Sequence, residues 1–540
     1  MEFMIKKDRT TKPFHRHWQF CVGSGHALLA LRTDYTRQLK WIHDELGIQY
    51  VRFHGIFNDD MHTLTNLGMF MPVPGAKAYQ EQNFHACGIA YDNVLAAGMK
   101  PFVELSFMPQ MLASGEAQCM FFYGGNVTVP AKYQAWRAYI QDFIRYLLHR
   151  YGKEEVRSWY FEVWNEPDLN PVFFSGSQKD YFCLYEETVR AIKEVDAALR
   201  VGGPATSGSK WIKEFVEYCE EHQVPADFVS THQYAGDPLA GVDGEGAVEE
   251  ATEIPEGVSV EELKQSMGQS MAAALSQAKE QTFLAGWRAL MPDKSETEEI
   301  PDDVFRRNAA FVRSQAGKLP VYYTEWNENA IFGARTNDTR KVAAYDVKAA
   351  LEVENLVDGS SVWCFSDIFE EMHQFAPEFH GGFGMLTLNG IPKPVFYGMK
   401  MLEKVGDERI DLGEKATFGE VGIAAFQSDK GIQILLFRQK MKNLDLPKEH
   451  VSVRVELDAE PQDVLLERID EEHCNPLKIW EEQGCPADLN AEEVKAIIEE
   501  SAMKEEKMEY RYEENMLCLD ANLGVNDVYL IQIRFENRNH

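Results

Sequence analysis

The chain has 540 residues, of which 45% are hydrophobic and 12% aromatic, and these values exclude a disordered protein. Its formal net charge of −32 argues against nucleic acid or an anionic membrane as a partner, because both would repel this surface. The nine cysteines form no Cys-x-x-Cys pair, and we find neither a secretory signal at the amino terminus nor a long apolar run. The sequence therefore predicts a cytoplasmic protein with reduced cysteines.

Short apolar runs rich in aromatic and β-branched residues alternate with helical patterns along the first two thirds of the chain. The eight predicted strands are Trp18–Gly23, Ile48–His54, Pro101–Ser106, Ser158–Glu166, Arg200–Gly203, Asp227–Tyr234, Leu319–Glu325 and Ser361–Asp367. This alternation predicts an α/β fold, the (β/α)8 or TIM barrel, whose chemistry lies at the carboxyl ends of the strands.

The connection between the sixth and seventh predicted strands is too long for a single crossover. It contains an acidic, Gly-rich stretch at Asp237–Glu262, a helical stretch at Ser266–Leu290 and a second acidic run at Asp293–Asp303. We expect this insertion on the active-site face, as a lid, an oligomer contact or a mobile loop, with a solvated loop as the preferred interpretation.

The pattern becomes β-rich after about Leu402. Asp429-Lys430-Gly431 links two apolar runs as a hairpin, and Asn490 with Glu493 predicts a capped helix over Ala491–Met503. We therefore predict three parts. Residues 1–14 form an amino-terminal segment that packs on a β-sandwich, 15–401 form the barrel with its acidic insertion at about 237–303, and 402–540 form the sandwich with a small helical element.

Two glutamates close predicted strands. Glu166 ends the fourth run, where Pro167 cannot donate a hydrogen bond to a neighbouring strand, and Glu325 ends the seventh. Strands of a parallel barrel deliver such side chains to one mouth. Two carboxyl groups at one centre suit acid/base and nucleophilic chemistry.

These motifs also resemble a known family. Trp164-Asn165-Glu166-Pro167, followed on a later strand by Thr324-Glu325-Trp326, resembles the retaining (β/α)8 glycosidases. Further stretches that resemble glycoside hydrolase family 39, the β-xylosidases and their relatives, are Phe20–His26, Val51–Gly55, Val201–Pro204, Asp227–Tyr234 and Phe379–Gly384.

The resemblance implies Glu166 as general acid/base and Glu325 as nucleophile of a retaining exo-glycosidase that acts on β-xylosides or short xylo-oligosaccharides. An α-L-arabinosidase or α-L-iduronidase-like activity is the alternative within the family. The implied partner is a small carbohydrate, with no cofactor and no metal, and a homo-oligomer is left open. The mechanism requires Glu166 to start protonated.

Other residues near the strand ends are candidates for the substrate pocket. Asn165 is expected to hydrogen-bond a sugar 2-hydroxyl, and Tyr234 to orient Glu325. The remaining candidates are His54 and His232, which line the pocket, Trp363, which offers an apolar face, and Glu370 and Glu371, which hold hydroxyls by charge-assisted bonds. We expect Glu104 and Glu162 to be buried polar partners.

For each candidate a purely structural role is the alternative. Asn165 could serve as a turn residue, and either histidine could be a buried core residue. A metal-dependent amidohydrolase, suggested by His15-Arg16-His17, is rejected because the fifth strand ends in Gly202-Gly203-Pro204 without a histidine. A Schiff-base aldolase would need a lysine at a strand end, and we find no lysine placed in this way in the sequence. The remaining rival is a non-catalytic carbohydrate-binding barrel.

Overall fold

The computed structural model describes residues 1–71, 73–76, 80–241, 258–276, 282–293, 299–372, 378–442 and 445–535. Within these residues, eight parallel strands close into a barrel and confirm the predicted (β/α)8 fold. The strands are β3 (Cys21–His26), β4 (Tyr50–His54), β7 (Lys100–Leu105), β8 (Tyr160–Val163), β9 (Arg200–Thr206), β10 (Phe228–Tyr234), β11 (Val321–Asn327) and β12 (Gly359–Val362). Helices cover the outside of these strands and side chains fill the centre of the barrel. The strand sequences are therefore almost continuous apolar runs.

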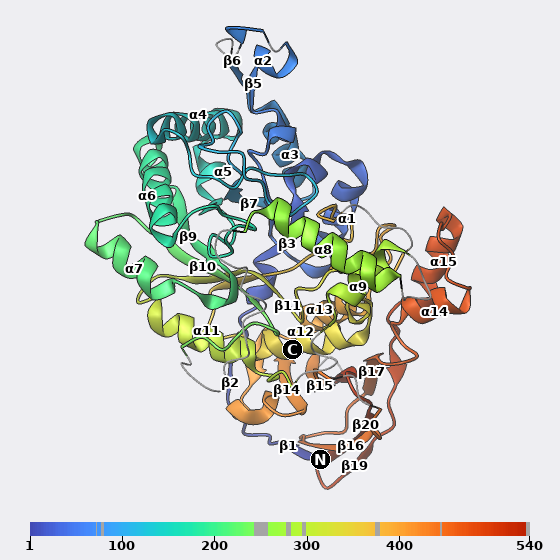
Figure 1. Cartoon of the computed structure of the whole chain (residues 1–540). Helices are drawn as coiled ribbons and strands as arrows, with labels where there is room; N and C mark the ends of the chain where they lie inside the picture. Colours follow the sequence, from blue (N-terminus) through green and yellow to red (C-terminus); the bar gives the residue numbers. More distant parts are fainter. Residues whose placement is uncertain are drawn as a thin grey trace.

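The helices of the barrel lie around this sheet (Figure 1). They are α1 (Thr33–Leu46), α3 (His85–Ala96), α4 (Tyr133–Tyr151), α5 (Lys153–Arg157), α6 (Gln178–Val195), α7 (Ile212–Glu221), α11 (Val304–Gln315), α12 (Arg340–Val353) and α13 (Pro394–Lys404). Local signals set their ends. Ser177 caps α6 together with Asp180 in a capping box, and Gly47 ends α1 in the left-handed conformation.

Several predicted strands begin or end at other residues in the structure. The seventh is Val321–Asn327 instead of Leu319–Glu325, and the fifth continues to Thr206 instead of ending at Gly203. The first strand begins at Cys21 rather than Trp18, because His17–Gln19 form a short 3-10 turn. The eighth ends at Val362 rather than Asp367. Beyond Val362 the pairing becomes irregular. The amides of Trp363 and Phe365 still donate to carbonyls of β11 and β3, and the amide of Met385, on a later loop, donates to the carbonyl of Cys364.

Two packed sheets follow the barrel and lie at the bottom of Figure 1. One has the order β1-β16-β20-β19 and the other β18-β17-β21-β15-β14-β13-β2. Their strands are β1 (Glu2–Ile5), β2 (Thr11–Pro13), β13 (Glu408–Ile410), β14 (Val421–Ser428), β15 (Gly431–Arg438), β16 (Glu449–Glu456), β17 (Asp463–Ile469), β18 (Glu506–Lys507), β19 (Arg511–Glu513), β20 (Met516–Leu523) and β21 (Val528–Arg534). Alternate residues of both sheets, such as Ile434 and Val453, share one apolar core, as in a β-sandwich.

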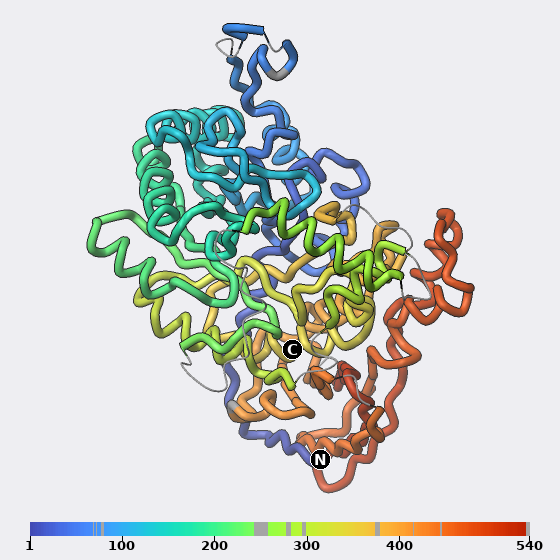
Figure 2. Tube along the Cα trace, viewed as in Figure 1, coloured from blue at the N-terminus to red at the C-terminus, as the bar shows by residue number. Residues whose placement is uncertain are grey.

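Segments from both the amino-terminal and the carboxyl-terminal part of the chain form this sandwich. The amino-terminal strand β1 pairs in parallel with β16, and β2 pairs with β13. The sandwich also carries α14 (Pro476–Glu482) and α15 (Ala491–Ser501), the second of which begins in the capping box of Asn490 and Glu493. In Figure 2 the blue amino-terminal segment lies beside red segments of the carboxyl-terminal region at the bottom of the view.

Two excursions leave the barrel. The hairpin β5 (Leu64–Asn66) and β6 (Gln80–Gln82), with α2 (Leu67–Phe70), projects at the top of Figure 1. Among its described residues, the insertion between β10 and β11 has the helices α8 (Val260–Leu275) and α9 (Phe283–Leu290), instead of the single helical stretch predicted. Much of its two acidic stretches lies outside the described residues.

Among the helices of the described residues, none combines the length and the apolarity that crossing a bilayer requires. The cytoplasmic location and a homo-oligomeric state stay predictions.

Candidate active site

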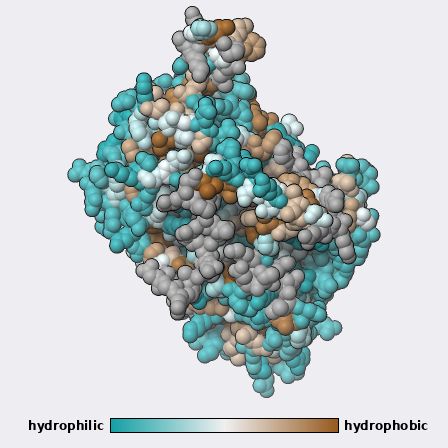
Figure 3. All heavy atoms as spheres, viewed as in Figure 1, coloured by the Kyte–Doolittle hydropathy of each residue, from teal (hydrophilic) through white to brown (hydrophobic). Residues whose placement is uncertain are grey.

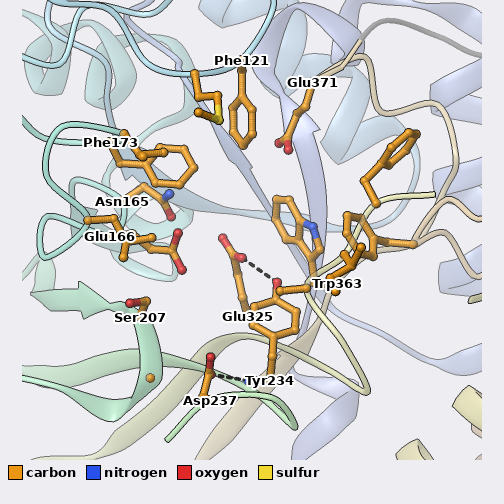
Figure 4. A pocket seen from close by; sticks show the side chains of 18 of the residues that line it. Phe121, Asn165, Glu166, Phe173, Ser207, Tyr234, Asp237, Glu325, Trp363 and Glu371 are labelled. Carbon is orange, nitrogen blue, oxygen red and sulfur yellow. Dashed lines mark hydrogen bonds between the residues drawn. The ribbon is translucent and has the colours of Figure 1, made fainter. Parts of the chain in front are cut away.

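A cavity of about 990 Å³ opens at the carboxyl ends of the barrel strands. Glu166 and Glu325 lie on its floor and face each other from opposite sides, with Phe121 and Glu371 across the cavity from Asp237 (Figure 4). The placement follows from the topology, because every parallel strand of the barrel delivers its last residues to the same mouth.

Glu166 is carried by a turn and not by a strand, which corrects the sequence-based interpretation. Strand β8 ends at Val163, three residues earlier than predicted, because Trp164 takes up a φ of 74° and leaves the extended conformation. Glu166 itself has a φ of 42°. Such left-handed residues cost about 1–2 kcal/mol each. The Glu166 amide donates to the carbonyl of Ala205 at 2.8 Å, and the Trp164 indole to that of Phe173 at 2.7 Å, which fixes the turn.

Glu325 lies inside strand β11, two residues before its end. Arg52 Nη1 donates to its Oε1 at 2.7 Å, and the Tyr234 hydroxyl donates to its Oε2 at 3.0 Å. Both contacts stabilise the negative charge of an ionised carboxylate and leave it pointing into the cavity. Tyr234 thus takes the place expected for it.

Arg52 contacts several of the polar side chains at the floor of the cavity. Its guanidinium is fully buried and also donates to Glu162 at 2.6 Å and to the Asn165 amide oxygen at 2.9 Å, and it lies 2.9 Å from Glu104. Burial lowers the pKa of Arg52, but the charges of Glu162, Glu104 and Glu325 outweigh it and raise this pKa overall. Because a guanidinium can only donate, Asn165 must present its carbonyl to Arg52, and its amide group is left as a donor.

His232 lies beneath the two glutamates. Its Nδ1 is 2.9 Å from Glu166 Oε1 and 3.7 Å from Glu325 Oε2. A bulge in β10 between Thr231 and His232 brings His232 opposite Glu325 across the strand pair. Burial lowers the pKa of His232 to about 4, so the ring is neutral at pH 7.

Glu166 is set apart from an ordinary carboxylate by its surroundings. Burial, and then the charge of Asp168, raise the pKa of Glu166 to about 8. Asp168 is held two residues further on by the backbone amide and the hydroxyl of Ser207, at 2.8 and 2.6 Å. A buried carboxyl group that stays protonated near neutral pH is suited to act as a general acid.

The two carboxyl groups are close together. One oxygen of Glu166, one of Glu325 and a ring nitrogen of His232 all lie within 4.8 Å of one another. Within the described residues this is the group of side chains near enough to hold a metal ion. The guanidinium of Arg52, 2.7 Å from Glu325, makes the site electrostatically unfavourable for a dication.

The other predicted site residues separate into two sets. His54, Trp363 and Glu371 line the cavity, and the His54 and Trp363 rings pack against each other at an interplanar angle of 37° with centroids 4.9 Å apart. His232 lies under the floor instead of lining it. Glu370 does not line the cavity and pairs with Arg32, so it is not in the position expected of a hydroxyl-binding residue.

Glu371 also differs in charge from the expectation. Its Oε1 lies 3.6 Å from His54 Nε2, and burial, followed by the charges of Glu325, Glu166 and Glu104, raises its pKa well above the usual range. Protonation is therefore favoured, and Glu371 can donate a hydrogen bond as well as accept one.

Sequence reasoning missed several residues of the site. Arg52 was part of a recognised stretch but was given no role, although an arginine inside an apolar strand needs a buried partner and Glu104 and Glu162 were expected to be buried. Phe121, Phe173 and the insertion residues carry no such signal, because their positions depend on long loops.

A closed parallel barrel with two acids at one mouth defines a glycosidase of the barrel type. The chain matches the model of glycosyl hydrolases family 39 over residues 1–274 and 284–513, and it therefore belongs to this family.

Relatives match over almost the whole length. A β-xylosidase from Caldicellulosiruptor saccharolyticus is 36% identical over 99% of this chain and 98% of its own, and one from Geobacillus stearothermophilus is 32% identical over 96% and 93%. The crystal structure of a monomeric β-xylosidase from Caulobacter crescentus CB15 superposes with a TM-score of 0.76 at 28% identity and covers 99% of both chains.

Proposed function

We propose that this chain is a retaining exo-glycosidase that releases xylose from β-xylosides or short xylo-oligosaccharides. The observation that carries the proposal is the separation of the two acids, since one oxygen of Glu166 lies within 4.8 Å of one of Glu325. Retaining enzymes hold their carboxyl groups about 5–5.5 Å apart, whereas inverting enzymes need about 6.5–9.5 Å to admit a water between them.

The reaction proceeds by two displacements. Protonated Glu166 donates its proton to the glycosidic oxygen as the Glu325 carboxylate attacks the anomeric carbon, so the bond to the leaving group breaks and a glycosyl-enzyme forms. Ionised Glu166 then takes a proton from water, which attacks the same carbon and releases Glu325. Two inversions at one carbon give net retention.

The surroundings of each acid support this assignment of roles. Arg52 and Tyr234 hold Glu325 as an oriented anion, while burial keeps the proton on Glu166. Once Glu325 is esterified, its charge is lost and Glu166 can ionise more readily to act as the base. The amide of Asn165 is placed to bind the sugar 2-hydroxyl, a contact that strengthens in the transition state.

The extent of the sequence matches supports a neutral pentose over a uronide. The two α-L-iduronidases that match this chain in sequence do so over only 18% and 13% of its length. The choice of xylose rests on the β-xylosidases that match it throughout.

A panel of nitrophenyl pentosides and hexosides, with the product anomer followed by NMR, tests the proposal. We expect nitrophenyl β-xyloside to be the best substrate and β-xylose to appear first, before mutarotation. If α-xylose appeared before β-xylose, the double displacement would be contradicted. A higher kcat/KM on an α-L-arabinoside, or on a uronide, would contradict the substrate.

A further inference from the structure

The cavity is much larger than one sugar ring requires. Its volume of about 990 Å³ is at the upper end of the range of about 300–1,000 Å³ that proteins use for drug-sized ligands. The acids occupy only its floor, so most of the space is left for the group attached to the sugar. That group lies on the outward side, because Glu166 protonates the oxygen that joins it to the sugar.

The helical insertion forms the outer wall of this space. Among the described residues of the insertion helices and the turn that follows them, those that line the cavity are Met267 on α8, Trp287 on α9 and Met291. All three side chains are apolar. Met120 and Val172, on two other loops, extend the same apolar wall.

Hydrogen bonds to the barrel loops fix α9 in this position. The Trp287 indole donates to the carbonyl of Phe332 at 2.8 Å, and Arg288 Nε donates to that of Gly333 at 2.6 Å. The absence of a side chain at Gly333 lets α9 approach this loop closely, because a β-carbon there would lie 2.9 Å from Cδ1 of Leu284. With its N–H already bonded to backbone, the Trp287 ring offers only apolar surface to a ligand.

The apolar surface continues to the outside of the molecule. The Phe283 ring stacks on Trp287 with an interplanar angle of 10° and centroids 6.2 Å apart, and it is 41% exposed. Met291 is 39% exposed. Brown and tan surface appears over α8 and α9 in Figure 3, beside the teal of the acidic protein. Exposed apolar surface at the rim of a cavity marks a binding site.

We propose that this wall is an aglycone site that selects xylosides whose leaving group carries an aromatic ring, over xylosides whose leaving group is another sugar. This inference rests on the proposed function. An aromatic ring gains from burial against tryptophan and methionine. A second sugar placed against Met267, Trp287 and Met291 would bring its hydroxyl groups against side chains that offer them no hydrogen bond, and their loss of water would go uncompensated on this side of the cavity.

The test compares three β-xylosides without activated leaving groups, namely methyl xyloside, 2-phenylethyl xyloside and xylobiose. We expect kcat/KM of the wild type to be about tenfold or more higher for the phenylethyl xyloside than for either of the others, since one buried phenyl group exceeds this difference in transfer free energy. In Trp287→Ala this preference should fall about tenfold.

Two further variants control for misplacement of the helices. Met267→Ala removes a wall residue on α8 and leaves the hydrogen bonds of α9 in place, so it should also reduce the preference. Phe70→Ala truncates a ring that is 81% exposed on the distant β5–β6 excursion and should leave it unchanged. An equal kcat/KM for methyl and phenylethyl xylosides, or a preference for xylobiose, overturns the aglycone site but not the xylosidase. If no xyloside is hydrolysed, the proposed function itself fails.

Discussion

The floor and the outer wall of the cavity are built differently. The floor consists of polar and charged side chains on barrel strands and on the turns that follow them, and one buried guanidinium, Arg52, contacts four other polar side chains there. The outer wall consists of apolar side chains on loops and on the helical insertion. Among the described residues, no single side chain links them as Arg52 links those of the floor. We infer that changes in the floor affect catalysis and stability together, whereas changes in the wall affect one class of substrate at a time.

Removing the nucleophile tests the floor with the largest effect. In Glu325→Gly we expect kcat to fall about 10⁴-fold or more, because the covalent step has no other attacking group. Thermal unfolding checks that the fold is retained. Azide separates the two roles, because it should yield the α-azide with Glu325→Gly and the β-azide with Glu166→Ala. The same anomer from both variants, or full turnover in Glu325→Gly, would show that the roles are wrongly assigned.

Removing the central cation tests whether the floor acts as one unit. Arg52→Met leaves Glu104, Glu162 and Glu325 buried without their counter-charge, and we expect the free energy of unfolding to fall by about 3–5 kcal/mol. Chemical denaturation measures the change. The matched control is Arg145→Met, whose exposed pair with Asp142 should contribute about 0–1 kcal/mol. Equal losses in the two variants would mean that Arg52 has no special place in the floor.

The neighbouring residues Glu370 and Glu371 test which side chains belong to the active site. Glu371 lines the cavity, while Glu370 pairs with Arg32 outside it. We expect Glu371→Ala to reduce kcat/KM for nitrophenyl β-xyloside by about 10- to 100-fold, the loss of one buried hydrogen-bonding group. Glu370→Ala should change it by less than about twofold. The reverse order would place the wrong side chain in the pocket.

The smallest expected effect concerns pH. Because Glu166 must be protonated to act as the acid and burial raises its pKa to about 8, kcat/KM should fall as the pH rises through about 8. In Asp168→Asn the negative charge that helps to raise this pKa is lost, so the fall should begin at lower pH. Ser207→Ala keeps the charge of Asp168 and should leave the profile in place. A shift to higher pH in Asp168→Asn would contradict the electrostatic explanation.

Local pattern was sufficient for the barrel and for the two acids. Apolar runs that end in Asn165-Glu166-Pro167 or contain Glu325 can be recognised without a structure, because strand periodicity and breaking residues act over a few positions. The exact end of β8 could not be predicted. Trp164 and Glu166 leave the extended conformation only because the carbonyls of Phe173 and Ala205 are there to receive their hydrogen bonds.

The class of fold, the alternation of strands and helices, and the two glutamates at the mouth of the barrel could thus be predicted from the amino-acid pattern. The contacts of Arg52 with the acids, the burial of His232 below the cavity, the choice of Glu371 over Glu370 as a lining residue and the position of Trp287 in the outer wall became visible only in the folded chain. The difference lies in how far along the chain the interacting residues are from each other. Secondary structure follows from neighbours along the chain, whereas the charges and surfaces that surround a substrate come from segments brought together by folding.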